Sequence, residues 1–251
     1  MRFITVGDLH IKYKALEEAE KQIPNCDKMI FLGDYLDEYK DKDGKPSNNT
    51  MFHFLKDVIQ LKKDYPEKVI LLLGNHDLQY WFYGTSTQSY TMCTGYRGNN
   101  IAWKIKNLIL SEPGVMNLFQ PIFQYKNYLW SHAGFTNTYF EKYIQPKLIK
   151  GVTFQDNIQR LFNIQDLDLF NVSVMRGGFY QRYESGFFWT DKTELIYDGL
   201  SIFNQIVGHS KVNDIETYPN LSNQTGYTSQ QTTMTFCDCL DKKLKFYELE
   251  I

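Results

Sequence analysis

Three short apolar segments near the start of the chain end in the same way, and this pattern constrains the fold more than any other feature. Residues 2–7, 28–33 and 68–74 are rich in Val, Ile, Leu and Phe, and each finishes on glycine. Segments of helical periodicity, 14–22 and 50–63, separate them. Continuous apolar strands that alternate with helices are typical of a parallel sheet covered on both faces. The first third of the chain therefore predicts an α/β fold.

The rest of the chain extends this pattern. Residues 126–134 and 203–208 have the same strand character, and residues 135–164 are mostly helical in pattern. The closing segments, 233–239 and 243–251, predict an antiparallel hairpin. We therefore expect two sheets sandwiched between helices.

An aromatic-rich segment at about residues 78–126 is predicted to be an insertion within a single domain that spans residues 1–251. Its four consecutive rings, Tyr80 to Tyr83, could stack on nucleobases or pack in a core. No basic patch accompanies them, so core packing is favoured.

Charge and hydropathy exclude several classes of protein. The 251 residues carry 27 basic and 29 acidic side chains, so no global field attracts nucleic acid or an anionic membrane. No apolar run approaches the ~18–20 residues that span a bilayer. The N-terminal sequence lacks the features of a signal peptide. The four cysteines show no CxxC spacing and are expected to be reduced thiols. We expect a cytoplasmic protein.

Polar residues follow the predicted strands at the points where these end. The carboxyl ends of strands in an open parallel sheet meet at one crevice, where ligands bind. Four of the five histidines lie at such ends, whereas His53 falls in a helical segment. Carboxylate, amide and imidazole groups without thiolate suit Mn, Fe, Zn or Ni. The candidate residues are Asp8, His10, Asp34, Asn75, His76, His132 and His209.

The sequences GDLH, GDYLD, GNHD, SHAG and GHS occur in this order along the chain. Together they resemble the motifs of the calcineurin-like metallophosphoesterase superfamily, from Asp8 to the C-terminal strands. SHAG and a lone GHS resemble the phosphoprotein phosphatase and diadenosine tetraphosphatase branch. RGG followed by SGxxWxD resembles the segment over the active site in bacterial and phage-type members of that branch. The resemblance implies a four-layer α/β/β/α sandwich.

The resemblance also implies a site for two divalent cations, which would be Mn, Fe, Zn or Ni, with Mn favoured. Asp34 would bridge both cations, and a hydroxide between them would attack phosphorus in line. The other implied ligands are Asp8 and His10 for the first cation, and Asn75, His132 and His209 for the second.

Two further motif residues would take part in proton transfer to the leaving group. The resemblance implies that His76 protonates the leaving oxygen and that Asp37 holds its imidazole in the acid form. Asp37 and Asp77 could instead cap a following helix. We favour catalysis for Asp37, and capping or support of the site for Asp77.

The chain departs from the family pattern where an arginine usually clamps the phosphate. Glu38 and Tyr39 stand there, and Glu38 would repel the substrate. Another arginine should compensate, because Arg suits bidentate phosphate binding. Arg176, in MRGG, is the first candidate and Arg97, in GYRG, the second, whereas Arg182 is expected to lie at the surface.

We therefore expect a dinuclear metal-dependent phosphoesterase that hydrolyses phosphomonoesters, with phosphoserine or phosphothreonine in proteins as candidate substrates. The alternative is cleavage of a dinucleoside polyphosphate or another nucleotide phosphoanhydride by the same metals. A non-catalytic scaffold is a third interpretation, disfavoured because such proteins typically lose ligands that are present here. The expected partners are phosphoproteins or nucleotides, with no nucleic acid and no membrane.

Overall fold

The chain divides into two compact units, called unit 1 and unit 2. Unit 1 comprises residues 1–120 and 240–251, and unit 2 comprises residues 121–239. The structure, a computed structural model, describes residues 1–37, 47–111, 114–172, 176, 184–221 and 232–251.

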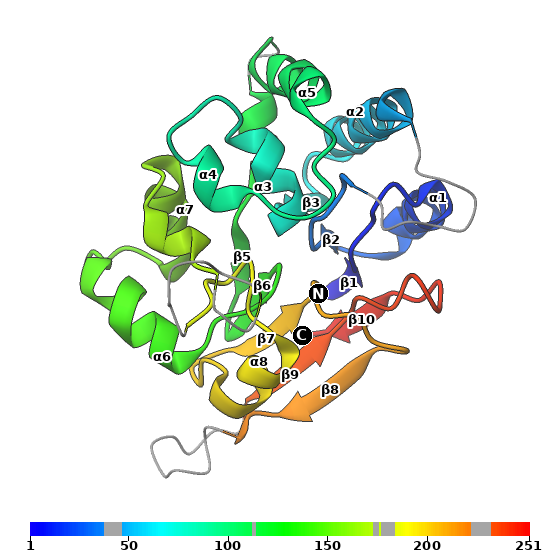
Figure 1. Ribbon diagram of the computed structural model, residues 1–251. Coiled ribbons are helices and arrows are strands. Elements are labelled where there is room, and N and C mark those ends of the chain that lie inside the picture. The colour runs from blue at the N-terminus through cyan, green and yellow to red at the C-terminus, as the bar shows by residue number, and fades with distance from the viewer. Residues whose placement is uncertain (38–46, 112–113, 173–175, 177–183, 222–231) are drawn as a thin grey trace. The chain divides into compact units, whose positions relative to one another are not determined.

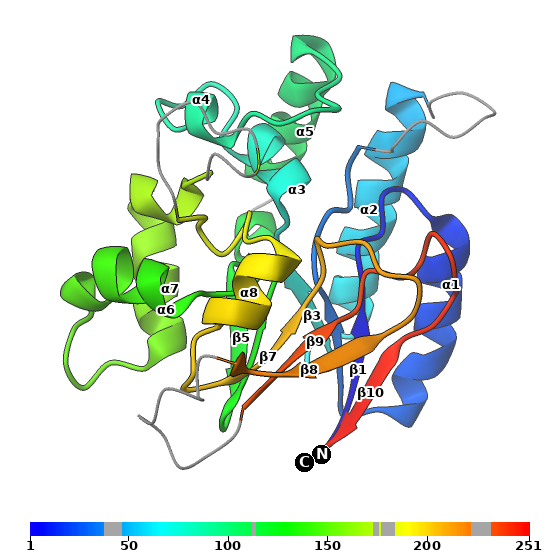
Figure 2. The same ribbon diagram turned by 60° about the horizontal axis from the view of Figure 1, so that its bottom comes forward.

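Unit 1 is built on a five-stranded mixed sheet with the strand order β10-β1-β2-β3-β4 (Figure 1). Its strands are β1 (Arg2–Val6), β2 (Lys28–Phe31), β3 (Val69–Leu72), β4 (Phe119–Gln120) and β10 (Tyr247–Glu250). Strands β1 to β4 are parallel, and β10 pairs antiparallel with β1. Figure 2 shows β1 and β10 side by side, with both chain termini at the same end. The three apolar segments thus form the parallel strands that they predict.

Helices alternate with the strands of unit 1, as the periodicity predicts. They are α1 (Tyr13–Gln22), α2 (Asn48–Asp64), α3 (Asn75–Trp81), α4 (Gln88–Thr91) and α5 (Asn99–Ser111), with 3-10 turns at Ile23–Asn25 and Val115–Leu118. The side chain of Ser47 caps α2 by accepting a hydrogen bond from the Thr50 amide at 3.1 Å. The helix then packs its apolar side against β3, which is buried along its whole length.

The aromatic segment belongs largely to unit 1, where α3, α4 and α5 follow β3. Tyr80, Trp81 and Phe82 are buried, and the Trp81 ring packs edge-on against Phe119 of β4. The favoured interpretation of this run, core packing, is confirmed. The boundaries of a single domain with an insertion stay a prediction.

Unit 2 is built on a second five-stranded mixed sheet, with the order β5-β6-β7-β9-β8. Its strands are β5 (Ile122–Tyr125), β6 (Tyr128–Ser131), β7 (Asn204–Val207), β8 (Glu216–Pro219) and β9 (Thr233–Phe236). Its helices are α6 (Asn137–Tyr139), α7 (Phe154–Asn163) and α8 (Lys192–Asp198), with shorter helical turns at Phe140–Ile144, Gln145–Lys147 and Leu167–Phe170. Strands β6, β7 and β9 run parallel. In the core, Leu195 of α8 packs with Val207 and Met234.

The predicted C-terminal hairpin is wrong. Strand β9 lies in the sheet of unit 2, where β7 and β8 occupy both of its edges. No edge of β9 is left for β10, which instead pairs with β1 in the sheet of unit 1. The two mixed sheets and their helices nevertheless confirm the predicted α/β fold. Within the described part of the chain, no helix combines the length and the apolar character needed to cross a membrane.

Candidate metal centre

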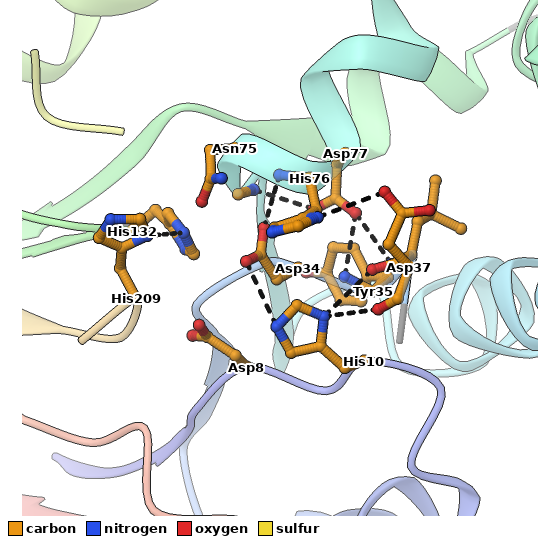
Figure 3. A network of polar contacts seen from close by, with 12 residues as sticks. Asp8, His10, Asp34, Tyr35, Asp37, Asn75, His76, Asp77, His132 and His209 are labelled. Atoms are coloured by element: carbon orange, nitrogen blue, oxygen red, sulfur yellow. Dashed lines mark hydrogen bonds and ion pairs between the residues drawn. The ribbon is translucent and has the colours of Figure 1, made fainter. Parts of the chain in front are cut away.

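The ends of the parallel strands of unit 1 carry a buried group of metal-ligating side chains. Asp8 and His10 follow β1, and Asp34 follows β2. All three are almost fully buried, at 1%, 3% and 2% exposure. One ligating atom from each lies within 4.8 Å of the others. Figure 3 shows these side chains directed toward one another. Buried charges of this kind are normally paired or bound to a metal.

The imidazole of His10 is oriented to act as a ligand through one nitrogen. Its Nδ1 donates to the backbone oxygen of Asp37 at 2.6 Å and lies 3.2 Å from that of Leu36. This arrangement places Nε2 3.6 Å from Asp34 Oδ2. Burial lowers the pKa of His10 well below its ordinary value, so the ring is neutral. A neutral imidazole whose other nitrogen bonds a backbone carbonyl is a common form of metal ligand.

The carboxylate of Asp34 is held by the backbone of the next motif. The amide of His76 donates to Asp34 Oδ1 at 2.9 Å, which leaves Oδ2 on the side of His10. Burial raises the pKa of the Asp34 carboxyl well above its ordinary value, and the charge of Asp8 acts in the same direction. A divalent cation beside these two carboxylates would stabilise their ionised forms. The donor set of oxygen and imidazole nitrogen therefore fits a metal ion of the predicted kind.

The backbone at the strand ends is strained where it carries these groups. His10, Asp34 and Asp37 have φ angles of 39°, 50° and 56°, in the left-handed region that non-glycine residues rarely adopt. A Cβ on Gly74 would overlap the Asp34 carboxylate, so that position requires glycine. Strain of this kind clusters at functional sites.

A second pair of side chains lies next to this cluster. The Nδ1 of His76 is 3.3 Å from Asp37 Oδ2, and both residues are buried. The hydroxyl of Tyr80 donates to Asp37 Oδ1 at 2.5 Å, and the amide of Gln79 donates to Oδ2. Burial alone would lower the pKa of His76. The charge of Asp34 and the bond to Asp37 outweigh this effect, so the pKa lies above its ordinary value. His76 is therefore placed to carry a proton.

Asp77 binds, through its side chain, the backbone of the loop that carries Asp34 and Asp37. Its Oδ1 accepts from the amides of Tyr35 and Leu36 at 2.9 and 3.2 Å, and its Oδ2 accepts from the amide of Gly74 at 2.9 Å. Asp77 thus caps the start of α3 and ties it to the loop after β2. The predicted supporting role agrees with these contacts.

Two histidines of unit 2 lie together at the ends of parallel strands. His132 follows β6 and His209 follows β7. The Nε2 of His132 is 3.2 Å from Nδ1 of His209 (Figure 3). The Trp189 ring lies edge-on to His209. His209 also has a positive φ of 59°. Two imidazole nitrogens at this distance could bind the same cation.

The candidate arginines have different surroundings. In unit 2, Arg176 lies 2.9 Å from Asp191 Oδ2 and donates to the Ser210 hydroxyl at 3.1 Å. In unit 1, the amide of Arg97 donates to the Tyr80 hydroxyl at 3.2 Å, so its loop adjoins the group around Asp37. His53 is exposed on α2, as a residue without a site role would be. Glu38, Tyr39 and Arg182 lie outside the described residues.

A family model described as calcineurin-like phosphoesterase matches residues 1–217, which include every predicted metal ligand. The chain belongs to the calcineurin-like phosphoesterase family. This finding confirms the family resemblance of the motifs, although it does not distinguish the branch.

One solved structure shares the fold at low sequence identity. A mutant cold-active protein tyrosine phosphatase is 16% identical, with a TM-score of 0.53, and the match covers 99% of this chain and 75% of that one. A metallophosphoesterase from Sphaerobacter thermophilus is 12% identical, with a TM-score of 0.38, over 94% of this chain and 75% of that one. At such identity the first likeness shows the fold alone. No curated protein matches the chain.

As a calcineurin-like phosphoesterase, the chain is in general a phosphoester hydrolase of a family that typically depends on two metal ions. Its cluster of Asp8, His10 and Asp34 could hold one of them. The role of each individual residue stays a prediction.

Sequence reasoning missed three residues around His76 in this calcineurin-like phosphoesterase. Gln79 and Tyr80 lie three and four positions after His76 on α3, a spacing that places side chains on one helix face and could have identified them. The third is Cys93, whose Sγ lies 3.6 Å from His76 Nδ1. It comes from a separate loop and carries no motif.

Proposed function

We propose that this calcineurin-like phosphoesterase is a metal-dependent phosphomonoesterase that acts on phosphoserine or phosphothreonine in proteins. The observation that supports it most is the buried pair of His76 and Asp37 beside the cluster of Asp8, His10 and Asp34. A proton donor next to a group of metal-ligating side chains fits a reaction in which a negatively charged phosphate ester loses an alkoxide.

The metal ligands are proposed from the motifs together with the contacts within each unit. Two divalent cations, when bound, supply Lewis-acid stabilisation of the phosphoryl oxygens and lower the pKa of bound water. In unit 1, the bonds described above orient His10 Nε2 and Asp34 Oδ2 as ligands. The motif order alone supports the remaining assignments. The proposed ligands are Asp8, His10 and Asp34 for the first cation, and Asp34, Asn75, His132 and His209 for the second.

His76 is proposed to protonate the leaving oxygen. Because Nδ1 is directed at Asp37, Nε2 is the nitrogen that would carry the proton to the substrate. Asp37 stabilises the imidazolium and is itself held by Gln79 and Tyr80. Fixed orientation matters here, because general acid catalysis needs a donor within hydrogen-bond reach of the leaving atom.

Arg176 is proposed to bind the phosphate in place of the family arginine. Its guanidinium already makes a charged contact with Asp191 and a hydrogen bond with Ser210, the neighbour of His209. Its planar fork could engage two phosphoryl oxygens. Arg97 is the second candidate, because its loop adjoins Asp37.

A cytoplasmic location and a phosphorylated protein partner belong to the same proposal. The four cysteines are thiols rather than disulfides, which is typical of a reducing compartment.

The experiment that tests the function compares three substrates with the Mn²⁺-loaded protein: an aryl phosphate, a phosphoserine peptide and diadenosine tetraphosphate. We expect hydrolysis of the aryl phosphate and of the peptide. A clear preference for the tetraphosphate would favour the phosphoanhydride alternative. If the protein binds no metal and hydrolyses none of the three, it is a non-catalytic scaffold instead.

A further inference from the structure

Cys93 adds a thiol to the pair of His76 and Asp37. It follows α4, and its Sγ lies 3.6 Å from the same His76 nitrogen, Nδ1, that faces Asp37 Oδ2 at 3.3 Å. One ligating atom from each of the three residues lies within 4.8 Å of the others. All three belong to unit 1. They form a group distinct from Asp8, His10 and Asp34.

The loop that carries Cys93 is anchored on both sides of the thiol. The Cys93 amide donates to Gln79 Oε1 at 3.2 Å, and Gln79 in turn donates to Asp37. Two residues further on, a Cβ on Gly95 would come within 3.3 Å of the Asp37 Cβ, so the backbone approaches Asp37 closely. Gly95 has a φ of 98°, a conformation that favours glycine. The position of the thiol therefore follows from the packing of this loop.

The separations between the three ligating atoms match a tetrahedral ion. Zn²⁺ binds thiolate sulfur at about 2.3 Å and imidazole nitrogen at about 2.0–2.1 Å, which places these two atoms about 3.6 Å apart. For imidazole nitrogen and carboxylate oxygen the corresponding separation is about 3.4 Å. The observed distances are 3.6 and 3.3 Å. Three protein ligands would leave the fourth position to water.

We propose that Asp37, His76 and Cys93 form a third cation site, which takes a thiophilic divalent cation such as Zn²⁺. Thiolate ligands select softer ions and disfavour Mn²⁺ and Mg²⁺, which separates this site from the oxygen and nitrogen cluster nearby. Hydrogen bonds to the Asp37 carboxylate from Gln79 and Tyr80 orient it as they would a ligand. Binding releases the Cys93 thiol proton and any proton on His76 Nδ1 to solvent.

A cation in this site would inhibit hydrolysis, and this consequence rests on the proposed function. Nδ1 of His76 would bind the ion instead of a proton, so the ring could no longer be an imidazolium. A neutral ring is a far weaker proton donor from Nε2 than the imidazolium is. Excess Zn²⁺ would therefore block the proton transfer without displacing Asp8, His10 or Asp34.

The site is tested with Co²⁺, a spectroscopic substitute for Zn²⁺, on the full chain loaded with Mn²⁺. A thiolate bound to Co²⁺ gives a charge-transfer band in the near ultraviolet, and the Asp and His cluster contains no thiol. We expect the band in the parent protein and in Cys26→Ser, a buried thiol elsewhere in unit 1, and its loss in Cys93→Ser and Cys93→Ala. Circular dichroism checks that the variants are folded. No band in the parent, or a band that persists in both Cys93 variants, would overturn the site.

Activity separates failure of the site from failure of the proposed function. For each variant, the rate of hydrolysis with added Zn²⁺ is divided by the rate without it. Only these ratios are compared between variants. We expect Zn²⁺ to lower the rate of the parent and of Cys26→Ser far more than that of Cys93→Ser. A band in a protein that hydrolyses no phosphate ester would support the site and reject the function. A band together with full activity in Zn²⁺ would support the site and reject His76 as the acid.

Discussion

At the scale of single residues, Asp37 is the point where several side chains meet. Its two carboxylate oxygens accept from Tyr80 and Gln79 and face Nδ1 of His76, all within a buried region. Its backbone adopts a positive φ of 56° in this arrangement. The orientation of Asp37 therefore depends on neighbours in the helix that follows β3. Substitution of those neighbours should alter how Asp37 orients the His76 imidazole.

Removal of His76 should slow turnover without removing Mn²⁺ from the proposed two-cation site. In His76→Ala we expect kcat to fall by about 10²–10⁴-fold, since a general acid typically contributes that much. The loss should be largest for alkyl phosphates, whose leaving groups are poor. In protein loaded with Mn²⁺ alone, which the thiol site disfavours, metal analysis should find the parent Mn²⁺ content in His76→Ala and a reduced content in Asn75→Ala. Loss of Mn²⁺ from His76→Ala would show that the division between acid and ligand is wrong.

Tyr80→Phe tests whether Tyr80 positions the acid. The change removes a hydrogen bond to a charged carboxylate, and we expect kcat to fall by about tenfold with little change in KM. The loss should grow as the leaving group becomes poorer, an effect that a general loss of stability would not produce. Tyr83→Phe, at a half-buried ring just beyond α3, is the matched control and should retain the parent profile. Equal losses for good and poor leaving groups would reject the positioning role.

Arg176→Ala tests the compensating arginine. We expect a higher KM and a lower kcat on an aryl phosphate, because contacts to phosphate act in both the ground state and the transition state. Arg160→Ala removes an arginine of α7 that donates to the Lys147 backbone oxygen, and it should leave both constants near the parent values. Unchanged kinetics in Arg176→Ala would reject Arg176 and favour Arg97 as the arginine that binds phosphate.

At the scale of secondary-structure elements, a charged contact ties α8 to β8 in unit 2. Lys192, on the first turn of α8, donates to Glu216 of β8, and the Tyr218 hydroxyl donates to the same carboxylate at 2.6 Å. The hydrogen bond from Lys192, followed by that from Tyr218, lowers the pKa of Glu216. Partial burial alone would lower the pKa of Lys192, but its hydrogen bonds to Glu216 and to the Tyr218 hydroxyl outweigh this effect and raise that pKa. The side chains are about 30% exposed, so the contribution is modest.

The stability due to Glu216 should depend on pH in a defined direction. Because its folded-state pKa is depressed, the contribution is complete above the ordinary carboxyl pKa of about 4.3 and is lost as the pH falls through the folded-state value. We expect Glu216→Gln to lower the free energy of unfolding by about 0.5–1 kcal/mol at pH 7. The difference should disappear in acid, as measured by thermal unfolding across pH. A difference that persists at low pH would mean that packing, not charge, is responsible.

At the scale of the whole molecule, the last strand closes the sheet in which the first strand lies. The register pairs four residues of β10 with β1, and the terminal amine of Met1 donates to the Ile251 oxygen at 2.6 Å. Strand β1 carries Asp8 and His10 at its other end. Strand β10 therefore pairs with the strand that leads to the proposed metal site.

Deletion of residues 247–251 should destabilise unit 1 and weaken metal binding. The deletion leaves an edge of β1 without its ladder, and at about 0.5–1.5 kcal/mol per net hydrogen bond we expect a loss of about 2–5 kcal/mol. An uncovered edge also promotes aggregation. Thermal unfolding, light scattering and Mn²⁺ titration measure these effects. Arg2→Ala, which removes only the contact with Glu248, should change them little. A deletion variant as stable as the parent would show that β1 needs no support from β10.

Two features could be predicted from local sequence: the alternation of strands and helices in the first third of the chain, and membership of the calcineurin-like phosphoesterase family. Apolar runs that end in glycine and a polar residue predict parallel strands from local chemistry. This holds for β1, β2 and β3, and for the placement of Asp8, Asp34 and Asn75 at their ends. Those predictions succeeded because the information for each one lies within a few consecutive residues.

Strand pairing and the surroundings of the proton donor, in contrast, depend on how distant segments pack. Strands β9 and β10 are neighbours in sequence but lie in different sheets. Both edges of β9 pair with other strands, whereas one edge of β1 pairs with β10. Cys93 meets His76 through a loop that packs on Asp37, a contact that no local pattern encodes. Edge availability and close packing depend on the whole chain, and for that reason they could not be derived from any segment alone.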